Sequence, residues 1–327
     1  MIKCLSNQLN INSRDFFGGD HVKKVLIIAC LIIMVFHSAA KTEERLQFST
    51  VDGSDGLPLN VVEAGNPNGP EILLIHGAGQ AYLAFKPQLE SLLLTQKFRI
   101  VAFDLRGHGN SGKPWQADLV LPSKVWADDI AAVIKAKKLL KPTIIGWSFG
   151  GFIVMDYVRH YGTANIAGIS LVSSLGGLIQ SKDALPNFSS LKWQKLINNG
   201  KKGRSSDLEK NIESAYFFAH LESKNSLSEK DKQFQFAMGM QVPAYFKNLL
   251  INRNLDNSDI IQELTLPLLI ITGSNDIIVP KEGTELLVKL LPICSSSIYE
   301  NSDHMPFFDE TERFNKEIAE FTIRLNQ

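Results

Sequence analysis

The sequence contains little cysteine. It has three cysteines among 327 residues, and two of them, Cys4 and Cys30, lie within the first forty residues. If that stretch is removed, Cys294 is left alone and no internal disulfide can form, so the fold must be stabilised by its core. Cys294 has no basic neighbour in the sequence, which favours an inert thiol over a nucleophilic one.

The sequence also lacks an excess of either charge. Lysine plus arginine and aspartate plus glutamate each number 34, so the formal net charge is zero. We find no basic stripe, low-complexity tract or repeat of solenoid length, and we expect no nucleic-acid partner. Hydrophobic residues make up 44% of the chain, which is ample for a large core and too apolar for a disordered protein.

No apolar run is long enough to cross a membrane comfortably. The run Val25–Phe36 follows Lys23 and Lys24, and as a helix its twelve residues would span about 18 Å, against a hydrocarbon core of about 30 Å. Small residues and then charged ones come next. This order is typical of a signal peptide over residues 1–40, cleaved after Ala40, and predicts a secreted or periplasmic protein. Left uncleaved, the segment would anchor the chain, which is the one membrane association we expect.

From residue 45 onward, short apolar segments alternate with amphipathic ones. Strands are predicted at Leu46–Val51, Leu59–Glu63, Ile72–Ile75, Arg99–Phe103, Thr143–Gly146, Ile166–Val172, Leu268–Thr272 and Ser296–Glu300. Helices are predicted at Tyr82–Thr95, Lys124–Lys138, Phe149–Tyr161, Glu282–Leu290 and Thr311–Leu325. This alternation indicates an α/β fold, with a mostly parallel central sheet and helices on both faces. Because the loops that follow parallel strands meet at one edge, we expect the functional residues there.

One stretch departs from this alternation. Between Leu175 and Gln262 the strand signals are weak, and helical patterns are joined by polar connections. We therefore predict a single domain over residues 41–327, with a helical cap inserted at about 176–262 that lies over the functional edge of the sheet.

The most informative motif is Gly146-Trp147-Ser148-Phe149-Gly150, between a predicted strand and a predicted helix. G-x-S-x-G occurs often by chance, and the serine could serve only as a helix cap. The strand–turn–helix context favours a nucleophile instead: the turn exposes the hydroxyl, and the glycines admit neighbouring backbone. The N-terminus of the following helix adds unpaired N–H groups and partial positive charge.

Further motifs occur in a familiar order. They are His76-Gly77-Ala78-Gly79, Asp104-Leu105-Arg106-Gly107-His108-Gly109-Asn110-Ser111, Gly273-Ser274-Asn275-Asp276 and Ser302-Asp303-His304-Met305-Pro306-Phe307. With the serine motif, they resemble the α/β-hydrolase superfamily, particularly its bacterial esterases, cofactor-free haloperoxidases and carbon–carbon bond hydrolases. The resemblance covers nearly everything from residue 45 onward except the insertion. It implies the α/β-hydrolase fold and an oxyanion hole formed by the backbone N–H groups of Ala78 and Phe149.

A serine hydroxyl needs a base, and histidine, with an ordinary pKa of about 6.5, is suited to that role. His304 follows the last predicted strand and precedes the last helix, which places it at the same edge as Ser148. His76 and His108 also follow strands, but the resemblance assigns structural roles to both. We therefore predict His304 as the base.

The imidazolium formed during the reaction needs an anion at its other nitrogen. Asp276 follows the strand Leu268–Thr272, and the chain order serine, aspartate, histidine fits this fold. Asp303 is a weaker rival because adjacent residues seldom turn their side chains toward each other. The sequence thus predicts a catalytic triad of Ser148, His304 and Asp276.

A serine at the nucleophile position predicts an acyl-enzyme intermediate. The leading hypothesis is a serine carboxylesterase acting on a small-molecule acyl substrate; within the same chemistry, a perhydrolase, a carbon–carbon bond hydrolase or an acyltransferase stays open. A non-hydrolytic ligand-binding relative is a further alternative. We find no metal-ligand cluster, phosphate loop or dinucleotide fingerprint, so neither a metal nor a cofactor is predicted. The sequence gives no indication of the oligomeric state.

Overall fold

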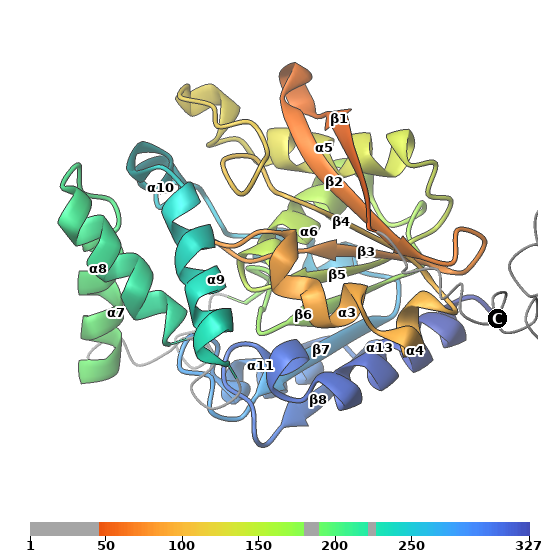
Figure 1. Ribbon diagram of the computed structural model, residues 1–327. Coiled ribbons are helices and arrows are strands. Elements are labelled where there is room, and N and C mark those ends of the chain that lie inside the picture. Colours follow the sequence, from red (N-terminus) through yellow and green to blue (C-terminus); the bar gives the residue numbers. More distant parts are fainter. Residues whose placement is uncertain (1–45, 180–189, 222–226) are drawn as a thin grey trace, which may run out of the picture. The chain divides into compact units, whose positions relative to one another are not determined.

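The computed structural model describes residues 46–179, 190–221 and 227–327, so the predicted signal peptide lies outside the described residues. A single eight-stranded sheet has the order β1-β2-β4-β3-β5-β6-β7-β8 (Figure 1). Its strands are β1 Gln47–Asp52, β2 Pro58–Gly65, β3 Glu71–Ile75, β4 Arg99–Phe103, β5 Thr143–Trp147, β6 Gly168–Val172, β7 Leu268–Gly273 and β8 Cys294–Tyr299. Only β1 with β2 and β2 with β4 pair antiparallel, so the prediction of a mostly parallel sheet is confirmed.

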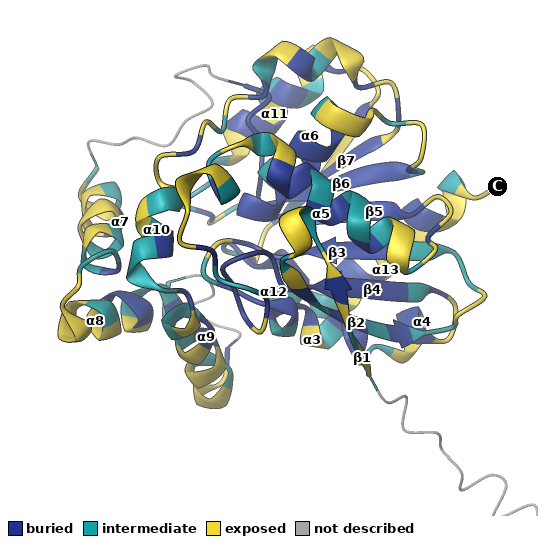
Figure 2. Ribbon diagram, turned by 90° about the horizontal axis from the view of Figure 1, so that it is seen from above, coloured by how far each residue is buried: buried dark blue, intermediate teal, exposed yellow. Residues whose placement is uncertain are grey.

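Helices cover both faces of this sheet. The described helices are α3 Lys86–Leu89, α4 Leu92–Thr95, α5 Ser123–Ala136, α6 Phe149–Tyr161, α7 Leu191–Lys202, α8 Leu208–Ala219, α9 Glu229–Gln241, α10 Ala244–Leu250, α11 Lys281–Leu290, α12 Pro306–Asp309 and α13 Thr311–Leu325. The strands are largely buried between these helices, while the outer sides of the helices are exposed (Figure 2).

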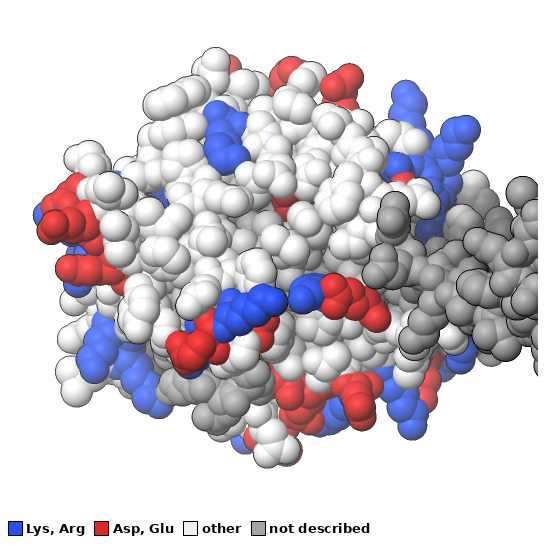
Figure 3. All heavy atoms as spheres, viewed as in Figure 1, with Lys and Arg blue, Asp and Glu red and all other residues white. Residues whose placement is uncertain are grey.

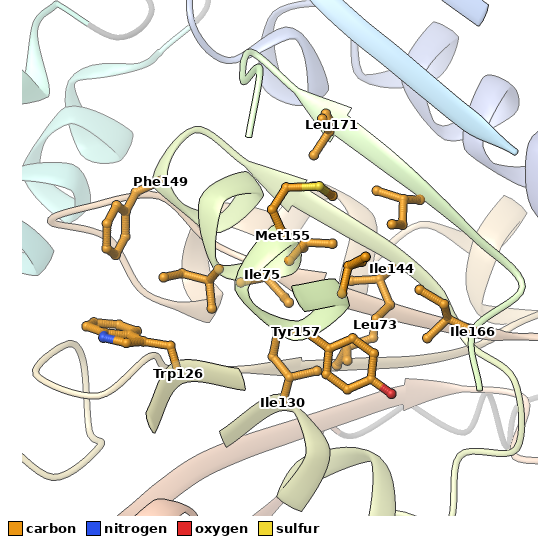
Figure 4. Close-up of a cluster of buried hydrophobic side chains, with 14 of the residues drawn as sticks. Leu73, Ile75, Trp126, Ile130, Ile144, Phe149, Met155, Tyr157, Ile166 and Leu171 are labelled. Carbon is orange, nitrogen blue, oxygen red and sulfur yellow. The ribbon is translucent and has the colours of Figure 1, made fainter. Parts of the chain in front are cut away.

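Strand β3 shows how alternate side chains fill two separate cores. Leu73 and Ile75 belong to a buried cluster that includes side chains of α5, α6 and α11, part of which is drawn in Figure 4. Ile72 and Leu74 belong to a second cluster, with side chains of α3 and α13. Because successive strand residues point to opposite faces, a continuous apolar strand supplies both layers at once.

The single helix expected over Tyr82–Thr95 does not form. The structure has a 3-10 turn at Tyr82–Phe85, followed by the separate helices α3 and α4. Pro87 lies in the first turn of α3, where its missing N–H is tolerated, and it cannot continue a helix from the preceding residues. Ser91 has an extended backbone (φ −74°, ψ 116°), which separates α3 from α4.

Helices α7 to α10, which we call the cap helices, lie in the chain between β6 and β7, where the insertion was expected. One of them approaches the loop after β3: a methyl group added at Gly239 of α9 would lie 3.9 Å from the carbonyl oxygen of Gly79. Among the described helices, none has both the length and the apolar character needed to span a membrane.

Candidate active site

The turn at Ser148 joins β5 directly to α6. Ser148 has φ 51° and ψ −118°, a conformation that is uncommon for a residue with a side chain and is found mostly at functional sites. Its N–H donates to the carbonyl of Val172 at the end of β6, across 2.9 Å. The neighbouring strand therefore holds the strained turn in place.

The glycines around Ser148 are required by close backbone contacts. A Cβ at Gly150 would lie 2.3 Å from the carbonyl oxygen of Ile75, and one at Gly146 would lie 2.9 Å from the backbone of Gly150. Real Cβ atoms do not approach other atoms so closely, which explains both glycines of the motif. A Cβ at Gly77 would lie 3.1 Å from the Cβ of Ser148, so the loop after β3 passes directly beside the serine.

The three predicted triad residues form one hydrogen-bonded row. Ser148 Oγ lies 2.9 Å from His304 Nε2, and His304 Nδ1 lies 2.8 Å from Asp276 Oδ2. A carboxylate oxygen can only accept, so Nδ1 carries the proton and Nε2 is left to accept from the serine hydroxyl. The three residues follow β5, β8 and β7, and the loops after these strands bring them together at one edge of the sheet.

The carboxylate of Asp276 is held by its own turn. Its Oδ1 accepts hydrogen bonds from the N–H groups of Ile278 and Val279, across 2.8 and 3.0 Å. The other oxygen, Oδ2, is left for the imidazole of His304. The imidazole of His304 thus pairs with Asp276 and not with its neighbour Asp303. The backbone N–H of Asp303 donates to Asp309 Oδ2.

His76 and His108 are buried, and their hydrogen bonds brace the surrounding loops instead of joining this row. His76 Nδ1 donates to the carbonyl of Gly77, and its Nε2 accepts from the N–H of Leu105. His108 Nδ1 donates to the carbonyl of Arg106. Burial lowers the pKa of His76 to about 4 and that of His108 to about 3, so both rings are neutral at physiological pH.

Two backbone amides were predicted to bind the oxyanion. Phe149 is the first residue of α6, where N–H groups have no acceptor within the helix. Ala78 follows Gly77, which lies against Ser148. Within the described part of the chain, no hydrogen bond uses the N–H of either residue.

The motif after β4 is structural. Asp104 accepts hydrogen bonds from the N–H groups of Tyr82 and Asn110 and from the side chain of Asn60. Arg106 and Asp129 form a fully buried ion pair, 2.7 Å apart. These contacts hold the loops on either side of the site.

Sequence reasoning missed two side chains close to the row. Trp147 Nε1 donates to the backbone carbonyl of His304 across 2.8 Å, a bond that fixes the loop of the base. Arg253 forms a buried ion pair with Asp156 of α6 at 2.6 Å, and its guanidinium lies 5.5 Å from the ring centre of Phe149. Neither contact has a local sequence signal, because the partners are 157 and 97 residues apart.

A small pocket adjoins the imidazole. The described residues that line it are Leu221, Asn275, Ile277, Ile278, Asp303 and His304. On the face shown in Figure 3, acidic and basic side chains are interspersed, and much of the area between them carries neither charge. No group of three or more histidine, cysteine, aspartate or glutamate side chains within the described ranges could hold a metal ion.

The family model of the alpha/beta hydrolase fold matches residues 70–311 of the chain. The chain belongs to the α/β-hydrolase family. This confirms the resemblance seen in the sequence motifs. The matched residues include the serine turn, both loops of the hydrogen-bonded row and the cap helices.

Individual α/β hydrolases resemble the chain over most of its length. YisY of Bacillus subtilis is 25% identical and covers 86% of this chain and 97% of its own. A bifunctional esterase/perhydrolase of Acinetobacter calcoaceticus is 26% identical, and the match covers 83% of this chain and 98% of the relative. A candidate aryl esterase from Burkholderia cenocepacia, known from its crystal structure, is 28% identical with a TM-score of 0.78. The match covers 85% of this chain and 99% of the esterase.

Proposed function

We propose that the protein is a serine hydrolase that cleaves a carboxylic ester, or a related small acyl substrate, through an acyl-enzyme. The observation that carries this proposal is the row from Ser148 Oγ through His304 to Asp276, with both contacts at hydrogen-bond distance. Relatives that are named esterases support the reaction class.

In the proposed first half-reaction, Ser148 Oγ attacks the ester carbonyl carbon while His304 Nε2 takes the hydroxyl proton. Asp276 stabilises the imidazolium and keeps its orientation. The oxyanion accepts hydrogen bonds from the N–H groups of Ala78 and Phe149. Because these donors are already in place before the reaction, each hydrogen bond stabilises the transition state by about 3 kcal/mol. The intermediate then collapses, and His304 returns the proton to the departing alcohol.

In the second half-reaction, water attacks the acyl-enzyme, with His304 acting again as base. Hydrogen peroxide could replace water at this step and give a peracid instead. The relative named as both esterase and perhydrolase makes this the second candidate. Assays with and without peroxide, on one ester substrate, would separate the two activities.

The proposal is tested with methyl and 4-nitrophenyl esters of rising acyl length, using wild type and Ser148→Ala. We expect turnover to fall by about four orders of magnitude or more, because nucleophile and base act jointly. A fluorophosphonate probe should label wild type at Ser148 and should leave Ser148→Ala unlabelled. The matched control is Ser206→Ala, at an exposed serine between α7 and α8, which should keep full activity. Undiminished activity in Ser148→Ala would refute the mechanism.

We further propose that residues 1–40 direct export and are removed. The basic residues, short apolar run and small residues before Lys41 support this. Mass spectrometry of protein purified from its source should give a mature N-terminus at Lys41. Recovery of the intact N-terminus in the membrane fraction would favour an anchor instead.

A further inference from the structure

Among the described residues, three segments of the chain line the pocket beside His304. The loops after β7 and β8 supply Asn275, Ile277, Ile278 and Asp303, and Leu221 lies two residues beyond the end of α8. Its volume is about 10 Å³, which is room for roughly one water-sized group. Leu221 and His304 therefore line the same small space.

The wall of this pocket follows from the turn that holds the acid. The N–H groups of Ile278 and Val279 donate hydrogen bonds to Asp276 Oδ1, so the backbone of residues 276–279 holds the carboxylate in position. The side chains of Ile277 and Ile278 are left half-buried beside the polar row. Aliphatic side chains that the protein itself does not fully cover, next to a reactive group, are typical of a substrate-binding wall.

The reaction chemistry decides which part of a substrate would meet this wall. The acyl carbonyl has to lie between Ser148 Oγ and the amides of Ala78 and Phe149. None of these three residues lines the pocket, whereas His304 does. The atom that must approach His304 Nε2 is the oxygen of the departing alcohol, because that nitrogen delivers its proton.

We infer that this pocket holds the alcohol part of the ester and restricts it to a small, uncharged group of about methyl size. The inference rests on the proposed function and names its substrate class. In acylation, the bond from Ser148 Oγ to the carbonyl carbon forms and the bond from that carbon to the alkyl oxygen breaks. The hydroxyl proton passes through His304 Nε2 to the alkyl oxygen, so a neutral alcohol leaves.

The test uses esters that share one acyl group, butanoate, and differ in the alcohol: methyl, ethyl, butyl and benzyl. All give the same acyl-enzyme, so differences in kcat/KM report the alcohol alone. Wild type should favour the methyl over the butyl ester by about tenfold or more, the range that a methylene-sized misfit produces. Ile278→Ala and Leu221→Ala enlarge the pocket and should raise the butyl-to-methyl ratio by about tenfold. Ile278→Val enlarges the pocket less and should raise the butyl-to-methyl ratio by a smaller factor. This variant replaces the alanine variants in the test if they fail to fold.

A control variant separates this effect from a general loss of activity. Leu290→Ala removes an exposed leucine from α11, outside the site, and should leave the ratio unchanged.

Partitioning of the acyl-enzyme gives an independent measurement. Methanol or butanol, added as competitor to water, must approach His304 from the position that the departing alcohol left. Wild type should transfer the butanoyl group preferentially to methanol, and Ile278→Ala should shift the preference toward butanol. If ester hydrolysis requires Ser148 but alcohol preference is the same in wild type and pocket variants, this inference is overturned and the proposed function stands. If wild type cleaves no ester at all, both are overturned.

Discussion

The indole Nε1 of Trp147 donates a hydrogen bond to the backbone carbonyl of His304, across 2.8 Å. Trp147 is the last residue of β5 and is almost fully buried, and the next residue is Ser148. The strand that ends in the hydroxyl therefore also fixes the loop that carries the base. This coupling sets the distance between Oγ and Nε2 independently of the hydrogen bond between them.

Replacing Trp147 with phenylalanine should lower kcat by about tenfold while changing KM little. The substitution keeps an aromatic ring against Phe307, whose ring centre is 5.0 Å away, but it removes the donor to His304. A buried carbonyl without its partner costs about 1–3 kcal/mol, so stability also falls. Trp126→Phe is the matched control, because Trp126 is equally buried and donates to the carbonyl of Val120, away from the base. Equal kcat values in the two variants would contradict the positioning role.

Gly150→Ala should destabilise the protein by about 3 kcal/mol or prevent folding, since overpacking of this severity lies at the upper end of measured costs. The added methyl group would lie 2.3 Å from the carbonyl oxygen of Ile75, which belongs to the central strand β3 and cannot move freely. Gly200→Ala in α7 is the control. There the nearest atom, in Arg204, is 3.5 Å away, and alanine gains up to about 1 kcal/mol of helix propensity. Urea unfolding of the two variants compares these effects directly, and similar midpoints would show that the contact at Gly150 is soft.

Much of the fold and of the row was predictable from sequence because the relevant signals are local. β4, α6 and α13 have the predicted bounds. Continuous apolar strands and amphipathic helices can be recognised from the pattern of a few neighbouring residues. The placement of Ser148, Asp276 and His304 at the ends of β5, β7 and β8 follows from topology. The contacts of Trp147 with His304 and of Arg253 with Asp156 could not be foreseen, because each joins segments about a hundred residues apart or more. The prediction of one continuous helix over Tyr82–Thr95 was wrong because it followed the helical spacing of the apolar residues and neglected Pro87, which interrupts a helix.

The pH dependence of stability should reveal the buried ring of His108. Its folded pKa is about 3, against an ordinary value near 6.5, because burial disfavours the charged form. Between those values the unfolded chain binds a proton that the folded chain does not, so this group's contribution is complete above pH 6.5 and is lost as the pH falls. His108→Phe should therefore reduce the slope of unfolding free energy against pH, between pH 6 and 4, by about 1.4 kcal/mol per unit. Parallel curves for wild type and variant, from urea unfolding at each pH, would show that the folded ring takes up its proton over the same pH range as the unfolded one.

Cys294, at the start of β8, should be unreactive in the native protein. The side chain packs in the buried cluster beneath α11, and burial raises the pKa of its thiol to about 12. The thiolate is the reactive form, so at pH 8 only about one thiol in ten thousand is available. Iodoacetamide should leave Cys294 unlabelled in native protein and should label it fully in guanidinium, with peptide mass spectrometry distinguishing it from Cys4 and Cys30. Ester hydrolysis should be unaffected by the reagent. Native labelling of Cys294 as fast as in the unfolded chain would mean that β8 opens readily, and activity should then fall with it, because β8 leads to the loop of His304.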